Sequence, residues 1–284
     1  MKNLLVLTDL TENAAHAALS AVALAKKMHT NILLFHTEIV QPMAPEYAGP
    51  PMLMNTIEDE EDLEKLQELT ESLTRHAQSG PGWKPEVQFQ QGVGDLADQV
   101  DDIESEKNIE MIVMGCREGG RIDHFLTGSE TFSVIDQSSR PVLVIPHESR
   151  LVNIRKVLFA TNYTDGDVGI VRYLVKLGHI FNFTLEIVHI NLLDENDITR
   201  NLRELEFMRH MHQIPNDGII YKEAYGKNIT RRLNRLCQES KADLLAFSHY
   251  KDSFFSRLFR RSVTRKAISA QTLPLLIFPA NFKQ

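Results

Sequence analysis

The chain has 284 residues and is poor in cysteine and in long apolar runs, and each shortage excludes a class of protein. Two cysteines, Cys116 and Cys237, are too few for a disulfide scaffold, and we expect both to be reduced thiols. No segment approaches the roughly 18 consecutive apolar residues that a membrane-spanning helix needs. The segment before Asp9 has neither a long apolar region nor a small-residue cleavage site, so we expect no signal peptide. The sequence therefore predicts a cytoplasmic protein without a membrane partner.

Several motifs of nucleotide and catalytic chemistry are also missing. No G-x-G-x-x-G follows the first apolar run and no G-x-x-x-x-G-K-[ST] occurs, which argues against a dinucleotide site and against a P-loop. The sequence has no Ser, His and Asp in the order of a catalytic triad, no motif of paired carboxylates and no H-E-x-x-H metal-binding motif. We therefore expect no catalytic residues, no metal site and no enzymatic role, with weak ATP hydrolysis or autophosphorylation left open as an alternative.

Charge is distributed unevenly along the chain. Residues 1–148 hold 10 Lys and Arg against 25 Asp and Glu, a net charge of −15; the totals of 31 and 38 then leave +8 for residues 149–284. Opposite charges on the two halves favour their association. The densest basic run carries no interleaved aromatic residues, so nucleic acid is not the partner that we expect. That run comprises Arg257, Arg260, Arg261, Arg265 and Lys266.

The sequence repeats itself once, which divides it into two domains. Asp9 and Asn162 are equivalent at an offset of 153 residues, as are His36 and His189, whereas Gly92 and Gly226 differ by 134. The second copy therefore lacks 153 − 134 = 19 residues, and the Pro-rich stretch 41–55 is the obvious extra segment of the first copy. We place the domains at residues 1–148 (the first half) and 149–284 (the second half).

Each copy alternates short apolar runs, typical of strands buried on both faces, with helical patterns. Thr11 is expected to cap the first helix. The first copy predicts strands over 3–8, 31–40, 86–92, 109–115 and 140–146, and helices over 14–28, 62–77, 95–107 and 129–139. The second predicts strands over 156–161, 183–190, 218–224, 242–248 and 273–279, and helices over 167–180, 197–211, 228–240 and 261–270. This order predicts an α/β fold of two tandem, doubly wound, five-stranded parallel-sheet domains.

Ligands of such sheets bind at the carboxyl ends of the strands, where the strand order reverses. Two loops of the first half are therefore candidates: the loop after the first strand, with Thr8 and Asp9, and the loop that begins at Gly115.

These loops carry a resemblance. Asp9 in TDLTENA and the segment MGCREGGRIDHFLTGSET, with Gly115, Gly128 and Ser129, resemble the nucleotide-binding members of the universal stress protein family in its tandem form. The segments QGVGD and RPVLVIP are similar to that family as well. The resemblance implies a Rossmann-like domain of the adenine-nucleotide alpha hydrolase type, a role in the stress response, and ATP or another adenine nucleotide as ligand, with or without Mg. The implied nucleotide-binding residues are Thr8, Asp9, Gly115, Gly128, Ser129 and Glu130.

The chain departs from the family pattern in both halves. In the first half, Glu118 stands where the second motif glycine is expected. In the second half the motif glycines are all replaced, which removes the close backbone approach that a phosphate needs. The glycine positions are occupied by Ser248, Lys251 and Arg261, Asn162 takes the place of the aspartate, and Ser262 stands at the Ser/Thr position of the motif. We therefore expect any nucleotide site to lie in the first half.

Alternatives stand beside these expectations. Asp9 could order the helix start instead of binding a ligand, and the glycines could form a structural turn. His36 and His189 are expected to be packed and hydrogen-bonded. A nucleotide-independent interaction protein, with an unknown protein partner, is the alternative function.

Two expectations concern assembly. The halves should form an intrachain pseudo-dimer through their last strands, with a further homodimer left open. Residues 41–55 are expected either to cover the strand-end cleft or to form an interface loop.

Overall fold

The computed structural model describes residues 1–38, 57–115, 129–149, 151, 153–192, 198–215, 218–249 and 273–282. The first half contains β1 (Asn3–Leu7), α1 (Glu12–Met28), β2 (Asn31–Glu38), α2 (Ile57–Gln78), β3 (Val87–Val93), α3 (Leu96–Glu106), β4 (Ile109–Gly115), α5 (Ser129–Gln137) and β5 (Val142–Ile145). The second half contains β6 (Lys156–Ala160), α6 (Asp165–Phe181), β7 (Thr184–Leu192), α7 (Ile198–Met211), β8 (Ile219–Gly226), α8 (Ile229–Ser240), β9 (Leu244–His249) and β10 (Leu275–Pro279).

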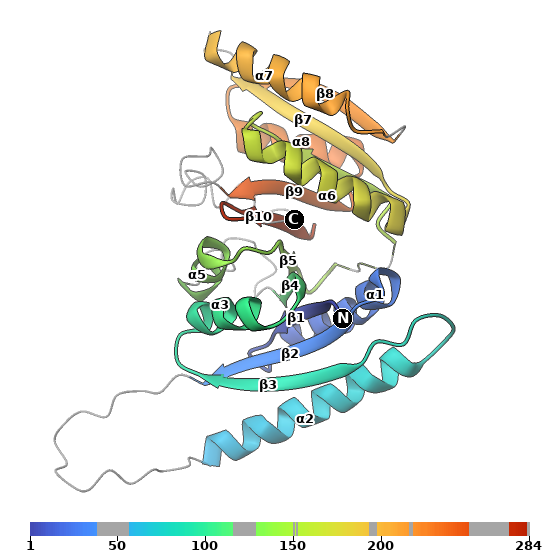
Figure 1. The fold of residues 1–284 in the computed structure, drawn as a ribbon, viewed down its shortest axis with the longest axis vertical. Coiled ribbons are helices and arrows are strands. Elements are labelled where there is room, and N and C mark those ends of the chain that lie inside the picture. Colours follow the sequence, from blue (N-terminus) through green and yellow to red (C-terminus); the bar gives the residue numbers. More distant parts are fainter. Residues whose placement is uncertain are drawn as a thin grey trace, which may run out of the picture.

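The strands form one sheet in the order β3-β2-β1-β4-β5-β10-β9-β6-β7-β8 (Figure 1). Within each half all paired strands are parallel, and the order in the second half repeats that of the first in reverse. The predicted fold class is confirmed, because each half is a doubly wound five-stranded parallel sheet. In each half the order reverses beside the first strand, between β1 and β4 and between β6 and β9.

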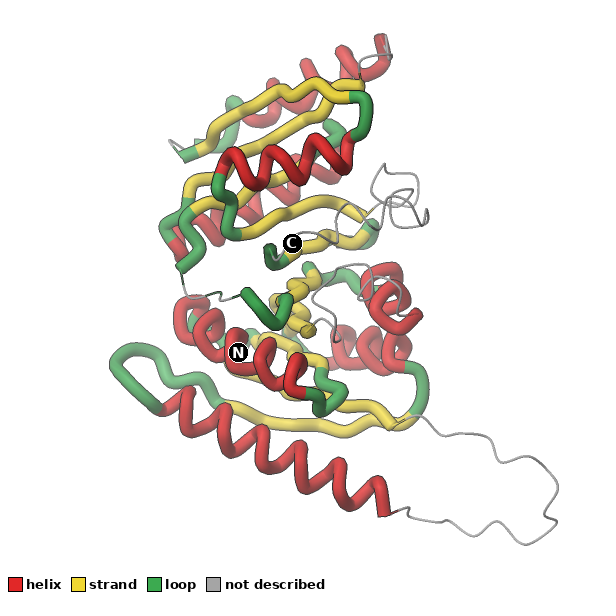
Figure 2. The backbone as a smooth tube through the Cα atoms, turned by 180° about the vertical axis from the view of Figure 1, so that it is seen from behind, coloured by secondary structure: helices red, strands yellow, loops and turns green. Residues whose placement is uncertain are grey.

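Helices cover both faces of the sheet (Figure 2). Side chains of α1, α2, α6 and α7 pack in one apolar cluster, and those of α3, α5 and α8 pack in a second cluster on the other face. The small residues Ala17, Ala18 and Ala21 of α1 are fully buried, which lets this helix lie close to the strands. Helices α1 and α6, which follow the first strands of the two halves, therefore lie on the same face of the sheet.

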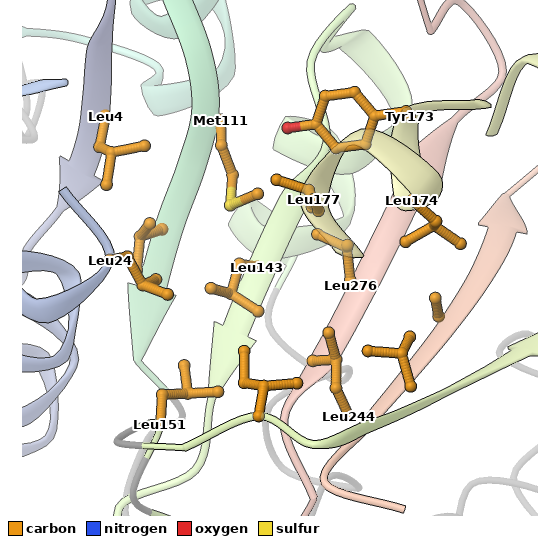
Figure 3. Packing of buried hydrophobic residues seen from close by; sticks show 14 of the residues in the cluster. Leu4, Leu24, Met111, Leu143, Leu151, Tyr173, Leu174, Leu177, Leu244 and Leu276 are labelled. Atoms are coloured by element: carbon orange, nitrogen blue, oxygen red, sulfur yellow. The ribbon is translucent and has the colours of Figure 1, made fainter. Parts of the chain in front are cut away.

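The two halves meet where β5 and β10 pair antiparallel, with Leu276 opposite Leu143. The first apolar cluster runs across this seam, since it includes residues of both halves (Figure 3). Figure 3 shows Met111 and Leu143 of the first half on one side and Tyr173, Leu177 and Leu276 of the second half on the other. The predicted intrachain pseudo-dimer through the last strands is therefore confirmed.

A polar contact also crosses between the halves. His249, the last residue of β9, lies with its Nε2 2.8 Å from Asp136 Oδ1 on α5. Helix α5 also touches β10. The C-terminal end of α5 therefore contacts the second half at the carboxyl end of β9.

Most expected elements are found within a few residues of their predicted ends. Helix α2 begins at Ile57, five residues before the expected start at 62, and β5 is confined to Val142–Ile145. The stretch 41–55 and the helix expected over 261–270 lie outside the described residues. No helix in the described part of the chain is long and apolar enough to cross a membrane. The domain boundary after residue 148 stays a prediction.

Candidate functional site

The loop between β1 and α1 is ordered by its own side chains. Thr8 is buried, its N–H donates to the Phe35 carbonyl at 2.9 Å, and its Oγ1 accepts from the N–H of Leu10 at 3.0 Å. Leu10 adopts a left-handed conformation with φ of 60°, which turns the chain toward the helix. Thr11 is the N-cap of α1 and accepts from the Ala14 N–H, as predicted.

Asp9 sits in this loop with an exposed side chain. Its Oδ1 accepts hydrogen bonds from the Thr11 N–H at 3.2 Å and from Thr11 Oγ1 at 2.6 Å. Asp9 therefore positions the N-cap residue without being the cap itself. Because the side chain is exposed at the carboxyl end of β1, ordering the helix start and contacting a ligand are compatible roles.

Gly115 is required by packing alone. In the parallel pairing of β1 with β4, Leu7 lies opposite Met114, which places Thr8 and Gly115 at the same edge of the sheet. A Cβ added to Gly115 would lie 2.6 Å from the Asn13 carbonyl oxygen and 3.2 Å from Ala14 Cα, both backbone atoms of α1. The glycine lets the first turn of α1 rest against the end of β4. The alternative prediction, a structural glycine, thus has a geometric basis at this position.

The other predicted nucleotide-binding residues lie where α5 begins. Ser129 is the first residue of α5 and Glu130 the second, and only their backbone is described; Gly128 and Glu118 fall outside the described residues. Free N–H groups and the positive end of the helix dipole are available at such a helix start, which suits an anion. Among the described residues no group of three or more His, Cys, Asp and Glu side chains could hold a metal ion.

Two histidines support the loops at the ends of β1 and β6. His36 Nδ1 lies 2.8 Å from the Thr8 carbonyl, and His189 Nδ1 lies 2.9 Å from the Thr161 carbonyl. A carbonyl oxygen can only accept, so each ring carries its proton on Nδ1. Both histidines are buried and hydrogen-bonded, as the repeat predicted. In the first half, His36 Nε2 also lies 3.9 Å from Asp62 Oδ2 on α2.

The second half closes the equivalent loop with a buried carboxylate that sequence reasoning missed. Asp167 Oδ2 accepts from Thr161 Oγ1 at 2.7 Å and from the N–H groups of Asn162 and Thr164, both at 3.2 Å. Burial raises the pKa of Asp167, while these hydrogen bonds act against that shift. The repeat places Asp167 at the position of Ala14, so a carboxylate on an otherwise apolar helix face was the available signal. Amide groups at this loop are thus satisfied from within the protein.

Each half has a groove between its first two helices. The groove between α1 and α2 has a volume of about 560 Å³ and is lined by residues that include Leu10, Leu69 and Arg75. The groove between α6 and α7 has a volume of about 410 Å³ and is lined by residues that include Tyr163 and Phe207. The repeat equates Leu10 with Tyr163, at the offset of 153, and Leu69 with Arg203, at the offset of 134. The two grooves are therefore equivalent in position and different in chemistry.

A family profile matches the sequence of the first half, and solved structures share the fold of the whole chain. The profile of the Universal stress protein family matches residues 1–146. A universal stress protein from Archaeoglobus fulgidus DSM 4304 is 20% identical, with a TM-score of 0.70, over 98% of this chain and 96% of that chain. A functionally unknown protein from Pseudomonas aeruginosa PAO1 is 14% identical, with a TM-score of 0.59, over 98% of this chain and 92% of that one.

A shorter solved structure is also similar to part of the chain. A universal stress protein in complex with cAMP is 19% identical, with a TM-score of 0.34, over 44% of this chain and 96% of that chain. No curated protein matches the chain. The similar solved structures of full length therefore support the fold of both halves, and the family profile covers the first half.

Proposed function

Because the chain belongs to the universal stress protein family, we propose that it is a regulatory protein whose first half binds an adenine nucleotide. The observation that carries this proposal is the position of the predicted residues at the reversal of strand order. Thr8 and Asp9 follow β1, Gly115 ends β4, and these strands are neighbours at that reversal. Crevices at such a reversal are the usual ligand sites of open parallel sheets.

The residues of the first half offer complementary chemistry for a nucleotide. The exposed carboxylate of Asp9 accepts hydrogen bonds and suits a ribose hydroxyl or an adenine amino group. The start of α5 offers N–H groups to phosphates, as the resemblance implies for Ser129 and Glu130. A bound Mg ion would supply further positive charge at the phosphates. The N–H groups of Leu10 and Thr11 are hydrogen-bonded within the loop to Thr8 and Asp9, which orders the loop around the Asp9 carboxylate.

The second half lacks this chemistry. Asn162 replaces the carboxylate, and its N–H donates to the buried Asp167. A nucleotide at this loop would have to compete with the Asp167 carboxylate for the N–H groups of Asn162 and Thr164. The nucleotide site is therefore proposed for the first half alone, with one nucleotide for each chain.

Purified protein should be denatured and the released small molecules identified by mass spectrometry, and ATP binding should be measured by calorimetry. Asp9→Asn keeps an oxygen that can accept from Thr11 but removes the charge, and we expect it to weaken ATP binding roughly tenfold or more. The matched control is Asn162→Ala, which alters the equivalent position of the second half and should leave binding unchanged. Gly128→Val should abolish binding because a β-branched side chain blocks backbone approach.

Three outcomes would count against the proposal. They are two equivalent ATP sites for each chain, unchanged binding in Asp9→Asn, and no binding of ATP, ADP, AMP or cAMP. The last outcome would favour the alternative function, an interaction protein that works without nucleotide.

A further inference from the structure

The groove between α6 and α7 has features that the nucleotide proposal does not use. It is lined by one face of each helix, with Val168 and Arg172 on α6 and Arg203 and His210 on α7. Its volume of about 410 Å³ lies within the range of small-molecule sites. All of its lining residues belong to the described part of the chain.

The floor of the groove is aromatic. Tyr163 and Phe207 are buried, and their ring centroids lie 5.2 Å apart at an angle of 50°. Tyr163 is held in place because its ring stacks on His189, at 4.4 Å and 25°. Tyr163 adopts a left-handed conformation with φ of 57°, and Leu10 adopts the equivalent conformation in the first half with φ of 60°. The floor is thus a fixed pair of rings where the first half has aliphatic side chains.

The rim of the groove is rich in donors. Arg172 and Arg203 are exposed, and neither has a hydrogen bond or ion pair with any residue in the described ranges. His210 Nδ1 lies 2.9 Å from the Glu206 carbonyl, which leaves Nε2 as its second polar atom. The acids Asp165 and Glu206 also line the groove, and Glu206 faces Arg209 at 3.6 Å. Two exposed arginines therefore line the same groove as the two aromatic rings, in the basic half of the chain.

The groove of the first half shows that this arrangement does not follow from the fold alone. Leu10 stands in place of Tyr163 and Leu69 in place of Arg203. Its Lys65 is held by Asp62 at 3.0 Å, and Glu68 and Glu71 line the same groove. The equivalent groove thus lacks the aromatic floor, and its lining holds one exposed arginine, Arg75, where the groove of the second half holds two.

We propose that the groove between α6 and α7 is a binding site for a small aromatic acid, that is, a single ring that carries a carboxylate or a phosphate group. Guanidinium groups bind both kinds of anion through paired N–H donors and also stack on aromatic rings. The ring lies on the apolar floor formed by Tyr163 and Phe207, and the acid group lies toward Arg172 and Arg203. The site is separate from the nucleotide site proposed for the first half.

The test uses the full chain and measures binding of phenyl phosphate and benzoate by calorimetry and ligand-observed NMR, with inorganic phosphate and phenol as comparison probes. We expect one saturable site for at least one aromatic acid and much weaker binding of inorganic phosphate and phenol. Arg203→Leu, which installs the residue of the first half, should weaken binding roughly tenfold or more. Arg231→Leu removes an equally exposed charge from α8, on the other face of the sheet, and should leave binding unchanged.

Tyr163→Leu tests the floor, because leucine already occupies this conformation at Leu10. It should weaken binding of the aromatic acid and leave the far-UV circular dichroism unchanged. Saturating ATP should not displace the aromatic acid, which separates this proposal from the nucleotide site.

The proposal is overturned if no aromatic acid binds saturably, if Arg203→Leu and Arg231→Leu bind alike, or if inorganic phosphate binds as well as phenyl phosphate. Displacement by ATP in the parent chain that is lost in Asp9→Asn would place the acid in the first half and would also overturn the proposal.

Discussion

Replacing Gly115 by alanine should destabilise the protein even without ligand. The added Cβ would lie 2.6 Å from the Asn13 carbonyl oxygen, about 0.8 Å closer than the 3.4 Å at which ordinary contacts begin. The Asn13 oxygen belongs to the backbone of α1, so no side-chain rotation relieves the clash, and α1 or the end of β4 must move. Overpacking of this kind costs about 1–3 kcal/mol.

The matched control is Gly178→Ala, in the interior of α6. Its added Cβ would meet Phe183 Cε2 at 3.4 Å, an ordinary contact. Alanine is favoured over glycine in helix interiors by about 1 kcal/mol, so this variant should stabilise the protein. The two substitutions add the same methyl group and have opposite predicted signs.

Urea unfolding followed by circular dichroism measures both variants without nucleotide. With an m-value of about 3 kcal/mol/M, the Gly115→Ala midpoint should fall by about 0.3–1 M, and the Gly178→Ala midpoint should rise by about 0.3 M. If Gly115→Ala unfolds at the parent midpoint, the close contact between α1 and β4 is wrong. The glycine would then need a ligand-based explanation.

Three further predictions concern other parts of the fold. Burial would raise the pKa of Glu186, but hydrogen bonds that include the one from Lys222 hold this pKa below its ordinary value of 4.5. The ionised Glu186 therefore stabilises the folded protein above pH 4.5. This stabilisation is lost as the pH falls through the lower pKa of the folded state. Replacing Glu186 by leucine, the residue at Leu33 in the first half, should therefore flatten the decline of the urea midpoint between pH 5 and 3, and an equally steep decline would contradict this. Leu276→Asp buries a charge in the seam and should make the chain cleave between its halves in limited proteolysis, whereas an unchanged cleavage pattern would argue against the shared core. Thr11→Ala removes the cap of α1 and should cost about 1 kcal/mol in urea unfolding, and a loss below 0.3 kcal/mol would show that the cap contributes little.

Local patterns were sufficient to predict the fold. Apolar runs such as residues 3–8 and 109–115 indicated buried strands, and the single repeat indicated two equivalent domains. The pairing of the last strands was expected from their apolar edges and from the family resemblance. These features depend on periodicity and order along the chain, which a sequence displays directly. The cap at Thr11 was predictable for the same reason, because capping involves neighbours within three residues.

The parts of the site that depend on distances between elements were not predictable. The sequence indicated that Gly115 was special, but the 2.6 Å approach to Asn13 depends on how α1 rests on β4. The contact of Asp136 with His249 depends on the seam between the halves. Asp167 was visible as an acid on an apolar helix face, but its acceptance of the loop N–H groups required the turn geometry.

Helix α5 connects the candidate nucleotide site of the first half to the second half. About 10 Å along the helix axis separate Ser129, at the candidate nucleotide site, from Asp136, which contacts His249 at the end of β9. A rigid rod of this length transmits an axial displacement at one end to the other with little loss. A shift of the helix start toward a bound phosphate would therefore reach the second half at the end of β9, through the contact of Asp136 with His249 and the packing of α5 on β10.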